Sequence, residues 1–358
     1  MKKVAIVTPG LITGGAETMA VRLAVNINKN EYQVKVYCLT EKKNTALEKI
    51  LENSNIDVEY LEKKGTGSLK TLNKLWHSLS AFKPDVVHSH ISGTIYALPW
   101  ILFHKCRLVH TVHTKPDQEF SKKLSSVLGW LAKRDKVVIV AVSKENQKIA
   151  SDYYKIGDKV VYVNNPVEIS KYYKNQKEDD SVVFINVSRQ DVNKNQILAI
   201  RAFSDVYKQV PNAKLVLVGD GNQHDALCKA AVDLNLSDVI DLVGESSEVE
   251  QFLADADVYI STSHREGLPL SMIEAMASKL PIISSDVGGI SDLIDGNGLL
   301  FKDDDKETFV KCMITLAKDK ELRKEMGDKS YDIVKSFDVS KCAEKYQEIY
   351  DCCMRRNS

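Results

Sequence analysis

The chain has 358 residues, of which 44% are hydrophobic and 27% charged, and its 49 basic and 49 acidic residues leave no formal net charge. This length predicts two domains of about 150 to 180 residues, each with an ordinary globular core. The seven cysteines show no CxxC pair and no metal-ligand spacing, which argues against a disulfide framework and predicts a reducing, cytoplasmic compartment.

The charge is distributed unevenly along the chain. Residues 1–168 contain 25 Lys and Arg against 16 Asp and Glu, whereas the remaining residues contain 24 against 33. Such a positive first half indicates an anionic partner for that half. We expect no nucleic-acid partner. The most apolar run, at 95–103, is about half as long as a membrane-spanning helix.

Short apolar segments alternate with amphipathic ones in the first half of the chain. Six segments rich in Val and Ile are expected to be strands: 3–9, 32–39, 85–90, 107–113, 137–143 and 159–165. Helical segments are expected between them, for example at 16–29 and 68–82. Strands and helices in alternation predict a parallel sheet that is covered on both faces.

The alternation resumes after a polar, charged segment at 164–181, which is the best candidate for a linker. Strands are expected at 181–188, 213–220, 239–245, 257–263 and 280–286, and helices at 196–209, 269–278 and 339–356. The predicted fold class is α/β, with two doubly wound, Rossmann-like domains at 1–166 and 167–338. We expect the terminal helix, at about 339–358, to pack back on the first domain.

Two glycine-rich turns follow strands. Gly14 and Gly15 lie where the first strand meets the first helix, and glycine there lets an anion approach the free N–H groups of the helix. An ordinary strand-to-helix turn explains this pair equally well. The second turn, with Gly219 and Gly221, has His224 where a dinucleotide fingerprint needs its third glycine, which argues against an NAD site.

A basic pair follows the strand at 181–188. Arg189 comes directly after this strand and Lys194 five residues later. An arginine and a lysine at the end of a strand can neutralise a diphosphate, because arginine binds phosphate in a bidentate manner and lysine acts as a point charge. The alternative is a solvated loop with ordinary charges.

Several histidines lie in or near strands of the first half. His113 ends the strand at 107–113, where it could bind a substrate hydroxyl or act as an acid or base. His110 lies within that strand and is expected to pack. His88 and His90 have the spacing of a metal pair, but no third ligand is evident, so we predict no metal site.

Glu266 and Glu274 flank the start of the helix at 269–278. Pro269 is suited to the first helical position, which puts Glu266 in the preceding loop and Glu274 inside the helix, about 10 Å apart along the axis. Both carboxylates could reach one elongated ligand across the helix N-terminus, as a sugar nucleotide would require. A hydrolytic pair is less natural, because glycosidase carboxylates flank a single bond.

These motifs together resemble the retaining glycosyltransferases of family 4, which have the GT-B fold of two facing Rossmann-like domains. The resemblance covers nearly the whole chain. It includes GGAET at 14–18, VSR with Lys194, VGDG at 218–221, VGE at 243–245, the Glu266–Glu274 spacing and DVGGISDLI at 286–294, in the family's order.

The resemblance implies roles around the donor diphosphate. Gly14 and Gly15 would approach its β-phosphate, and Arg189 and Lys194 would bind the diphosphate. It implies no metal ion and no cofactor, because cations and a helix end would stabilise the leaving diphosphate. It also suggests front-face attack, in which the diphosphate accepts the proton of the acceptor.

The resemblance implies further roles along the donor. Gly244 and Glu245 would hold the base and Glu274 the ribose, while Glu266 would bind sugar hydroxyls and His113 would lie beside the reacting sugar. The helix-start loop over phosphate and sugar would consist of Gly267, Leu268, Pro269 and Leu270.

The positive first domain is expected to hold the acceptor. The basic stretch at 119–136, with Trp130, could rest on an anionic membrane, and Trp100 lies on another basic-flanked segment. We therefore predict a peripheral membrane enzyme that transfers a hexose or N-acetylhexosamine from a nucleotide sugar, by family preference a UDP-sugar, to a polyprenyl-linked glycan of a bacterial surface polysaccharide. The alternatives are an ordinary lysine-covered helix, a sugar-nucleotide epimerase, and a non-catalytic sugar-nucleotide-binding subunit.

Overall fold

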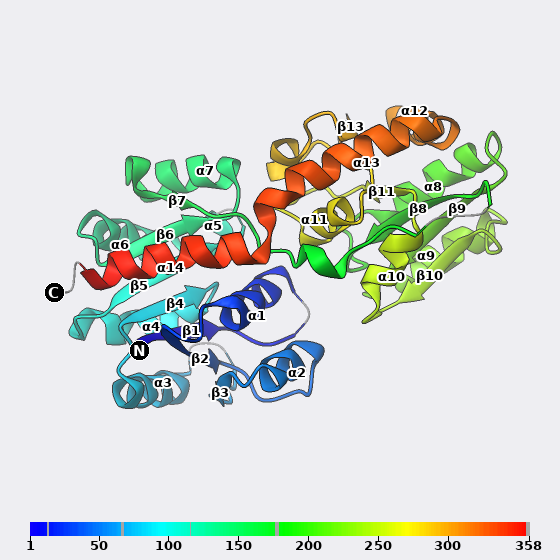
Figure 1. The fold of residues 1–358 in the computed structure, drawn as a ribbon. Helices are drawn as coiled ribbons and strands as arrows, with labels where there is room; N and C mark the ends of the chain where they lie inside the picture. The colour runs from blue at the N-terminus through cyan, green and yellow to red at the C-terminus, as the bar shows by residue number, and fades with distance from the viewer. Residues whose placement is uncertain (13, 66–67, 115, 176–178, 356–358) are drawn as a thin grey trace. The chain divides into compact units, whose positions relative to one another are not determined.

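The computed structural model describes the chain except residues 13, 66–67, 115, 176–178 and 356–358, and it divides the chain into two compact units (Figure 1). Unit 1 comprises Met1–Pro166 and Asp338–Ser358, and unit 2 comprises Val167–Phe337. The middle of the expected linker and the end of the expected terminal helix lie outside the described residues. With these boundaries, unit 1 has 29 Lys and Arg against 19 Asp and Glu, and unit 2 has 20 against 30.

Unit 1 contains a parallel sheet of seven strands in the order β3-β2-β1-β4-β5-β6-β7. The strands are β1 (Lys2–Thr8), β2 (Tyr32–Cys38), β3 (Asp57–Tyr60), β4 (Val86–His90), β5 (Arg107–Val112), β6 (Val137–Ala141) and β7 (Val161–Tyr162). The central strands β1, β4 and β6 are largely buried on both faces; β1 and β6 contain runs of Val, Ile and Ala, and β4 also buries His88, Ser89 and His90.

The helices of unit 1 connect the strands and cover the sheet. They are α1 (Gly15–Asn26), α2 (Ala46–Asn53), α3 (Leu69–Phe82), α4 (Gly93–Phe103), α5 (Pro116–Glu119), α6 (Lys122–Lys133), α7 (Lys144–Tyr154), the 3-10 helix η1 (Gly157–Lys159) and α14 (Val339–Arg355). One apolar core lies between the sheet and α3, α4, α6 and α7.

The terminal helix α14 belongs to unit 1, where it packs against α1, β4 and β5 (Figure 1). Its buried Tyr350 hydroxyl lies 2.7 Å from Nδ1 of His88. At the surface, Asp351 accepts hydrogen bonds from Nζ of Lys2 at 2.7 Å and from the hydroxyl of Tyr32 at 2.5 Å. These contacts hold α14 against β1, β2 and β4.

Unit 2 contains a second parallel sheet, of six strands in the order β10-β9-β8-β11-β12-β13. The strands are β8 (Val182–Val187), β9 (Ala213–Val218), β10 (Ile240–Gly244), β11 (Val258–Ser261), β12 (Ile282–Ser285) and β13 (Gly298–Phe301). The helical elements are η2 (Ile169–Lys171), α8 (Gln196–Tyr207), α9 (His224–Asp233), α10 (Val249–Asp255), α11 (Leu270–Ala277), η3 (Gly288–Leu293), α12 (Lys306–Lys318), α13 (Lys320–Val334) and η4 (Lys335–Phe337).

The α/β fold class with two doubly wound parallel sheets is confirmed, and the differences are local. The two edge strands β3 and β13 were not predicted. The helix expected from Pro269 starts one residue later, at Leu270, with Pro269 as its N-cap. In both sheets the strand order reverses beside the first strand, between β1 and β4 and between β8 and β11. In open α/β sheets, ligands bind at the carboxyl ends of the strands at such a reversal.

Candidate active site

The reversal in unit 2 brings the predicted lysine and glutamate together. Lys194 lies in the loop after β8, and Glu266 in the loop after the adjacent strand β11. Nζ of Lys194 is 2.6 Å from Oε1 of Glu266, and the same oxygen accepts a hydrogen bond of 2.7 Å from the hydroxyl of Ser263. The side chains of Lys194 and Glu266 are only 20% and 10% exposed. Lys194 and Glu266 therefore form a shielded ion pair at the carboxyl edge of the sheet, where a ligand is expected to bind.

The two loops that carry this pair are tied to each other. The hydroxyl of Thr262 donates to the carbonyl oxygens of Lys194, at 3.0 Å, and of Asn195, at 2.9 Å. The N–H of His264 donates to the carbonyl of Asn193 at 2.8 Å, and the side-chain amide of Asn193 donates to the carbonyl of Arg265. The backbone on both sides of the ion pair is thereby held before any ligand binds.

Arg189 lies apart from this shielded pair. Its side chain is 77% exposed, and its Nε donates to Oδ2 of Asp191 at 2.7 Å. Asp191 also accepts a hydrogen bond from the backbone N–H of Lys194. The loop after β8 thus presents one shielded cation, Lys194, and one solvated cation, Arg189.

The glycines of the second turn and of the DVGG segment allow loops to pack closely. A Cβ at Gly219 would overlap the carbonyl oxygen of Ser188, and one at Gly221 would overlap that of Gln190. Gly288, with a φ of +58°, lies in the same way against the carbonyl oxygen of Glu266. Glycine is therefore required at these positions, because any side chain would collide with the neighbouring backbone. The resulting close packing supports the loops that carry Lys194 and Glu266.

The start of α11 follows Glu266. Leu268 is buried, whereas Gly267, Pro269 and Leu270 are partly exposed. Glu274, the fifth residue of α11, is half-buried. The helix offers backbone N–H groups at its N-terminus, which follows Glu266 closely in the chain.

Beneath this helix lies a buried tyrosine, Tyr259 of β11, whose hydroxyl is 2.8 Å from that of Ser271. Burial raises the pKa of Tyr259, the hydrogen bond with Ser271 lowers it, and the charges of Glu266 and Glu274 raise it further. Both glutamates thus act on one phenol, which therefore stays neutral and serves as a hydrogen-bonding support for α11.

The residues expected to hold the base lie at the end of β10. Gly244 has a φ of +78°, and its carbonyl accepts a hydrogen bond of 2.7 Å from the N–H of Gly219. Glu245 follows and is exposed. The turn after β10 is therefore joined to the glycine turn after β9.

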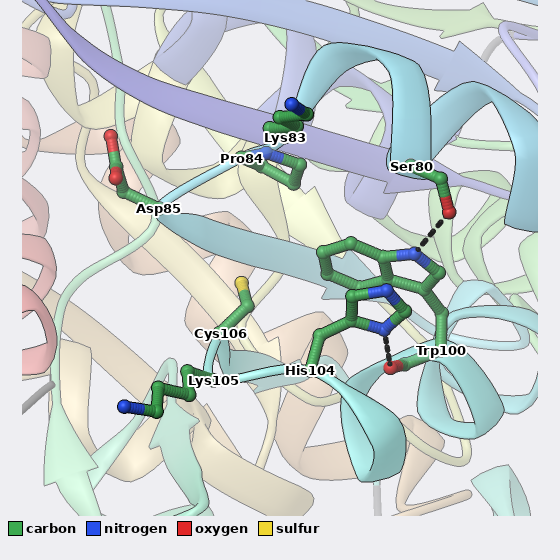
Figure 2. Close-up of a pocket in the computed structure, with 8 residues that line it drawn as sticks. All are labelled: Ser80, Lys83, Pro84, Asp85, Trp100, His104, Lys105 and Cys106. Atoms are coloured by element: carbon green, nitrogen blue, oxygen red, sulfur yellow. Dashed lines mark hydrogen bonds between the residues drawn. The ribbon is translucent and has the colours of Figure 1, made fainter.

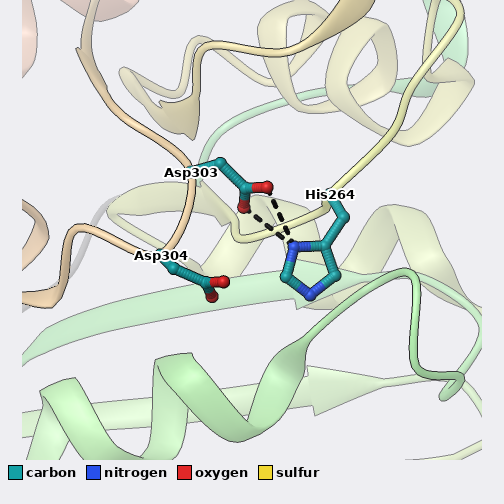
Figure 3. A group of neighbouring side chains, drawn as sticks. All are labelled: His264, Asp303 and Asp304. Atoms are coloured by element: carbon teal, nitrogen blue, oxygen red, sulfur yellow. Dashed lines mark hydrogen bonds and ion pairs between the residues drawn. The ribbon is translucent and has the colours of Figure 1, made fainter.

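One group of potential metal ligands lies beside the Glu266 loop (Figure 3). Nδ1 of His264 is 2.9 Å and 3.0 Å from the two carboxylate oxygens of Asp303, while Asp304 accepts a hydrogen bond from the amide of Asn195 at 2.9 Å. Both aspartates are exposed and already have protein partners. These contacts account for the group as a hydrogen-bonded pair, His264 with Asp303, and a contact between two loops, Asn195 with Asp304.

In unit 1, Gly14 is the N-cap of α1 and Gly15 its first residue. Gly14 is partly exposed and Gly15 is exposed, at the carboxyl end of β1. Burial raises the pKa of Glu17, in the first turn of α1, while a backbone hydrogen bond acts against that rise. The carboxyl group of Glu17 lies directly against Gly14 in this turn.

His113 follows β5, and its ring contacts that of His90, the last residue of β4. Nε2 of His113 is 2.9 Å from Nδ1 of His90, which is fully buried. In the sequence, His90 was considered only as half of a metal pair with His88, and that site was rejected for lack of a third ligand. The structure instead gives the two nitrogens of His88 hydroxyl partners, on Tyr350 at 2.7 Å and Thr111 at 2.8 Å.

A carboxylate that sequence reasoning missed, Glu119 of α5, supports His113. One of its oxygens accepts hydrogen bonds from the backbone N–H groups of His113, at 2.6 Å, and Thr114, at 3.1 Å. The other lies 3.2 Å from Nε2 of the buried His110. Burial raises the pKa of Glu119, but contacts with His110 outweigh it, so this pKa is lowered. An acid within a basic stretch is the only signal that the sequence contained.

The basic stretch at 119–136 contains Glu119, the last residue of α5, and the whole of α6. The residues of α6 that face solvent include cations and two large apolar side chains but no acid: Lys122, Lys123, Ser126, Val127, Trp130 and Lys133. Trp130 is 52% exposed, and the guanidinium of Arg134 lies 3.8 Å from the centre of its ring.

Trp100, unlike Trp130, is buried, so the expectation that it lies at a membrane-facing surface was wrong. It is 3% exposed, stacks on His104 and donates its indole N–H to Ser80 (Figure 2). These residues line a cavity of about 400 Å³ near the amino ends of β4 and β5. The cavity is thus at the edge of the sheet opposite to His90 and His113. No helix among the described residues is long and apolar enough to cross a bilayer.

Comparison with known proteins covers both units. The family described as "Glycosyl transferases group 1" matches residues 169–332, and "Glycosyltransferase Family 4" matches residues 13–171. The chain is 28% identical to an uncharacterized glycosyltransferase of Methanocaldococcus jannaschii, over 78% of this chain and 82% of the relative. It is 26% identical to the UDP-Gal:alpha-D-GlcNAc-diphosphoundecaprenol alpha-1,3-galactosyltransferase of Escherichia coli, over 79% of each chain.

A solved structure shows the same fold. The crystal structure of Anabaena HepE in complex with UDP-glucose matches with a TM-score of 0.83 and 20% identity, over 98% of this chain and all of that chain. The two parallel sheets and the two family matches agree on one assignment. The chain belongs to the group 1 glycosyltransferases of family 4, with the GT-B fold.

Proposed function

We propose that the protein transfers a hexose or N-acetylhexosamine, with retention, from a UDP-sugar to a lipid-linked glycan of a bacterial surface polysaccharide. The observation that carries the proposal is the shielded Lys194–Glu266 pair at the strand reversal of unit 2. A UDP-sugar donor is supported by two similar proteins: the Escherichia coli galactosyltransferase, which uses UDP-Gal, and HepE, which was solved with UDP-glucose. The Escherichia coli enzyme also supports a polyprenyl diphosphate acceptor.

In this proposal different residues of unit 2 bind different parts of the donor. Lys194 binds the diphosphate, and Arg189 folds in from solvent to add a second cation. Glu266 accepts hydrogen bonds from sugar hydroxyls, and Glu274 does the same for the ribose. The N-terminus of α11, from Gly267 to Leu270, faces the phosphates.

The turn with Gly244 and Glu245 holds the base, through its backbone. In unit 1, Gly14 and Gly15 approach the β-phosphate, and His113 lies beside the reacting sugar. The exposed glycine turn and the protein-bound imidazole are the observations that support these two assignments.

The proposed chemistry needs no protein nucleophile. The acceptor oxygen bonds to the anomeric carbon on the face from which the diphosphate departs, the bond from that carbon to the diphosphate oxygen breaks, and a diphosphate oxygen takes the acceptor's proton. Lys194, Arg189 and the α11 N-terminus stabilise the negative charge that develops on the leaving group. We propose that no metal is needed; transfer that persists in excess EDTA is the expected result.

The decisive experiment is a panel of nucleotide sugars, read by nucleotide release with and without polyprenyl-linked acceptors. Release of UDP that depends on the acceptor is the expected result. A sugar-nucleotide epimerase would instead convert the donor without an acceptor, and a non-catalytic subunit would bind the donor without turnover. Lys194→Ala is the matched inactive variant.

The acid-free face of α6 supports a peripheral position at the cytoplasmic side of a membrane. Flotation with liposomes tests this, because Lys123→Glu with Lys133→Glu should abolish binding to anionic vesicles. Lys318→Glu with Lys320→Glu, on exposed positions of unit 2, is the control for charge alone. Equal flotation with neutral and anionic vesicles would contradict the membrane proposal.

A further inference from the structure

The imidazole of His113 contacts a second imidazole, that of His90, and this contact determines which nitrogen of His113 carries the proton. β4 and β5 are adjacent and parallel, so His90 at the end of one and His113 after the other meet at the same edge of the sheet. Their nitrogens, Nδ1 of His90 and Nε2 of His113, are 2.9 Å apart. In a hydrogen bond between two neutral imidazoles, one nitrogen carries the proton and the other accepts it.

The opposite side of the His90 ring decides which nitrogen donates. Nε2 of His90 is buried and has no hydrogen-bond partner among the described residues. A proton on that nitrogen would leave a buried N–H without an acceptor, which is rarer in proteins than an unpaired acceptor. The proton of His90 is therefore best placed on Nδ1, from which it donates to Nε2 of His113.

The proton of a neutral His113 then has one remaining position. Because Nε2 accepts from His90, the proton must be on Nδ1. No hydrogen bond to this Nδ1 occurs within the described residues, and it is not among the buried polar atoms that lack a partner. His113 thus has one N–H available for an external oxygen, and Glu119 holds the backbone that carries it.

We propose that His90 is a positioning residue: it fixes His113 as the Nδ1–H tautomer, so that His113 donates a hydrogen bond to the sugar nucleotide and transfers no proton. The choice between ligand binding and acid–base catalysis, which the sequence left open for His113, is decided by the neighbouring ring. The identity of the ligand rests on the proposed function, whereas the tautomer does not.

The surroundings keep both rings neutral. Burial lowers the pKa of His113 to about 4; Glu119 on α5 acts against this shift and His110 on β5 adds to it. Burial also holds the pKa of His90 well below its ordinary value, and His88, His113 and His110 lower it further. Neither ring is therefore in its protonated, imidazolium form near neutral pH.

The first test needs no activity. Long-range proton–nitrogen NMR of protein with ¹⁵N-labelled histidine distinguishes Nδ1–H, Nε2–H and protonated rings, and the His113→Asn spectrum identifies the signals of His113. We expect the Nδ1–H form throughout about pH 6 to 8, where a free histidine would titrate. An Nε2–H form, or protonation of His113 in this range, would overturn the inference.

The second test uses the shapes of amide side chains. The amide of Asn can place an N–H near the position of Nδ1, whereas that of Gln reaches the position of Nε2, so His90→Asn should restore most of the activity that His90→Gln loses. We expect His90→Gln to lower kcat about tenfold, the effect of one well-placed hydrogen bond. His77→Gln, on the exposed surface of α3, is the matched control and should be unchanged.

The pH profile separates positioning from a merely structural effect. In His90→Gln the ring of His113 loses its partner and gains water, so its pKa should rise toward about 6.5 and an acidic limb should appear in kcat. Wild-type rates with a wild-type profile would overturn the inference. If wild-type protein turns over no sugar nucleotide, the proposed function fails and the NMR result still decides the tautomer.

Discussion

Nζ of Lys194 lies 2.6 Å from Oε1 of Glu266, although the two residues are 72 positions apart in the chain. The two side chains form an ion pair and are largely shielded from solvent: that of Lys194 is 20% exposed and that of Glu266 is 10% exposed. A diphosphate that binds to Lys194 must therefore compete with Glu266, and Glu266 becomes available for a sugar hydroxyl when it releases the ammonium. We propose that the pair couples phosphate binding to sugar binding.

This coupling predicts opposite effects of two substitutions on the binding of UDP alone. Lys194→Ala should weaken it by about 10- to 100-fold, since a charge-assisted hydrogen bond is lost. Glu266→Gln should bind UDP at least as tightly as wild type, because a competing negative charge is removed, while its kcat for transfer falls. Isothermal titration calorimetry measures both affinities.

The double variant is the control for this prediction. Glu266→Gln should strengthen UDP binding more in the Lys194→Ala background than in wild type, because the glutamate left without its lysine repels the phosphates in the single variant. Strictly additive effects would mean that the ion pair plays no part in donor binding.

The two glutamates should also differ in kinetics. Glu274→Ala should raise both the KM for the UDP-sugar and the Kd for UDP by about tenfold with little change in kcat, because a ribose contact is the same in ground state and transition state. Glu266→Ala should instead lower kcat. Steady-state kinetics with a fixed acceptor concentration separates the two, and a Glu266→Ala enzyme with wild-type kcat would show that this division is wrong.

Gly288 should be more sensitive to alanine than another glycine of the same conformation. Gly288 and Gly157 have φ values of +58° and +57°, but a Cβ at Gly288 would overlap the carbonyl of Glu266, whereas no atom of the described residues lies within 4 Å of one at Gly157. Both alanines cost about 1 kcal/mol of backbone strain, which urea denaturation measures. Only Gly288→Ala should also lower transfer, by at least about tenfold, because it displaces the Glu266 loop. Equal activities would contradict this role of Gly288.

Unit 1 should lose stability as the pH falls below about 6.5. Burial lowers the pKa of His88, His90 and His113, the last to about 4. Between these values the unfolded chain binds more protons than the folded one, so the free energy of unfolding rises with pH and is lost on acidification. Each histidine contributes at most about 1.4 kcal/mol per pH unit.

Urea denaturation followed by tryptophan fluorescence measures this loss in unit 1 alone. The three tryptophans of the chain, Trp76, Trp100 and Trp130, all belong to that unit. The midpoint should fall between pH 7 and about pH 5, and more steeply in wild type than in His90→Asn. A midpoint independent of pH would contradict the buried neutral histidines.

The sequence predicted most of the fold because the buried parallel strands are dense in Val and Ile. The structure adds β3 and β13, each four residues long and at an edge of its sheet. Residues Asp57–Tyr60 include no fully buried side chain, so no apolar run marks this strand. Short edge strands are determined by the neighbour on which they pair, which a local pattern does not contain.

The individual residues of the candidate site could be proposed from the sequence, but which of them contact one another could not. Lys194 and Glu266 could each be placed after a strand, whereas their contact depends on β8 and β11 being neighbours. The same holds for His90, which the spacing in VVHSH paired with His88. The order of the strands instead brings it to His113, and Glu119 arrives from a short helix with no periodic signal.

The most direct test of the account is a crystal structure of the protein with an intact UDP-sugar. We predict that a diphosphate oxygen lies within about 3 Å of Nζ of Lys194, that Glu266 has left the ammonium for hydroxyls of the sugar, and that Glu274 contacts the ribose. A diphosphate bound away from Lys194, with the Lys194–Glu266 ion pair unbroken, would contradict the account.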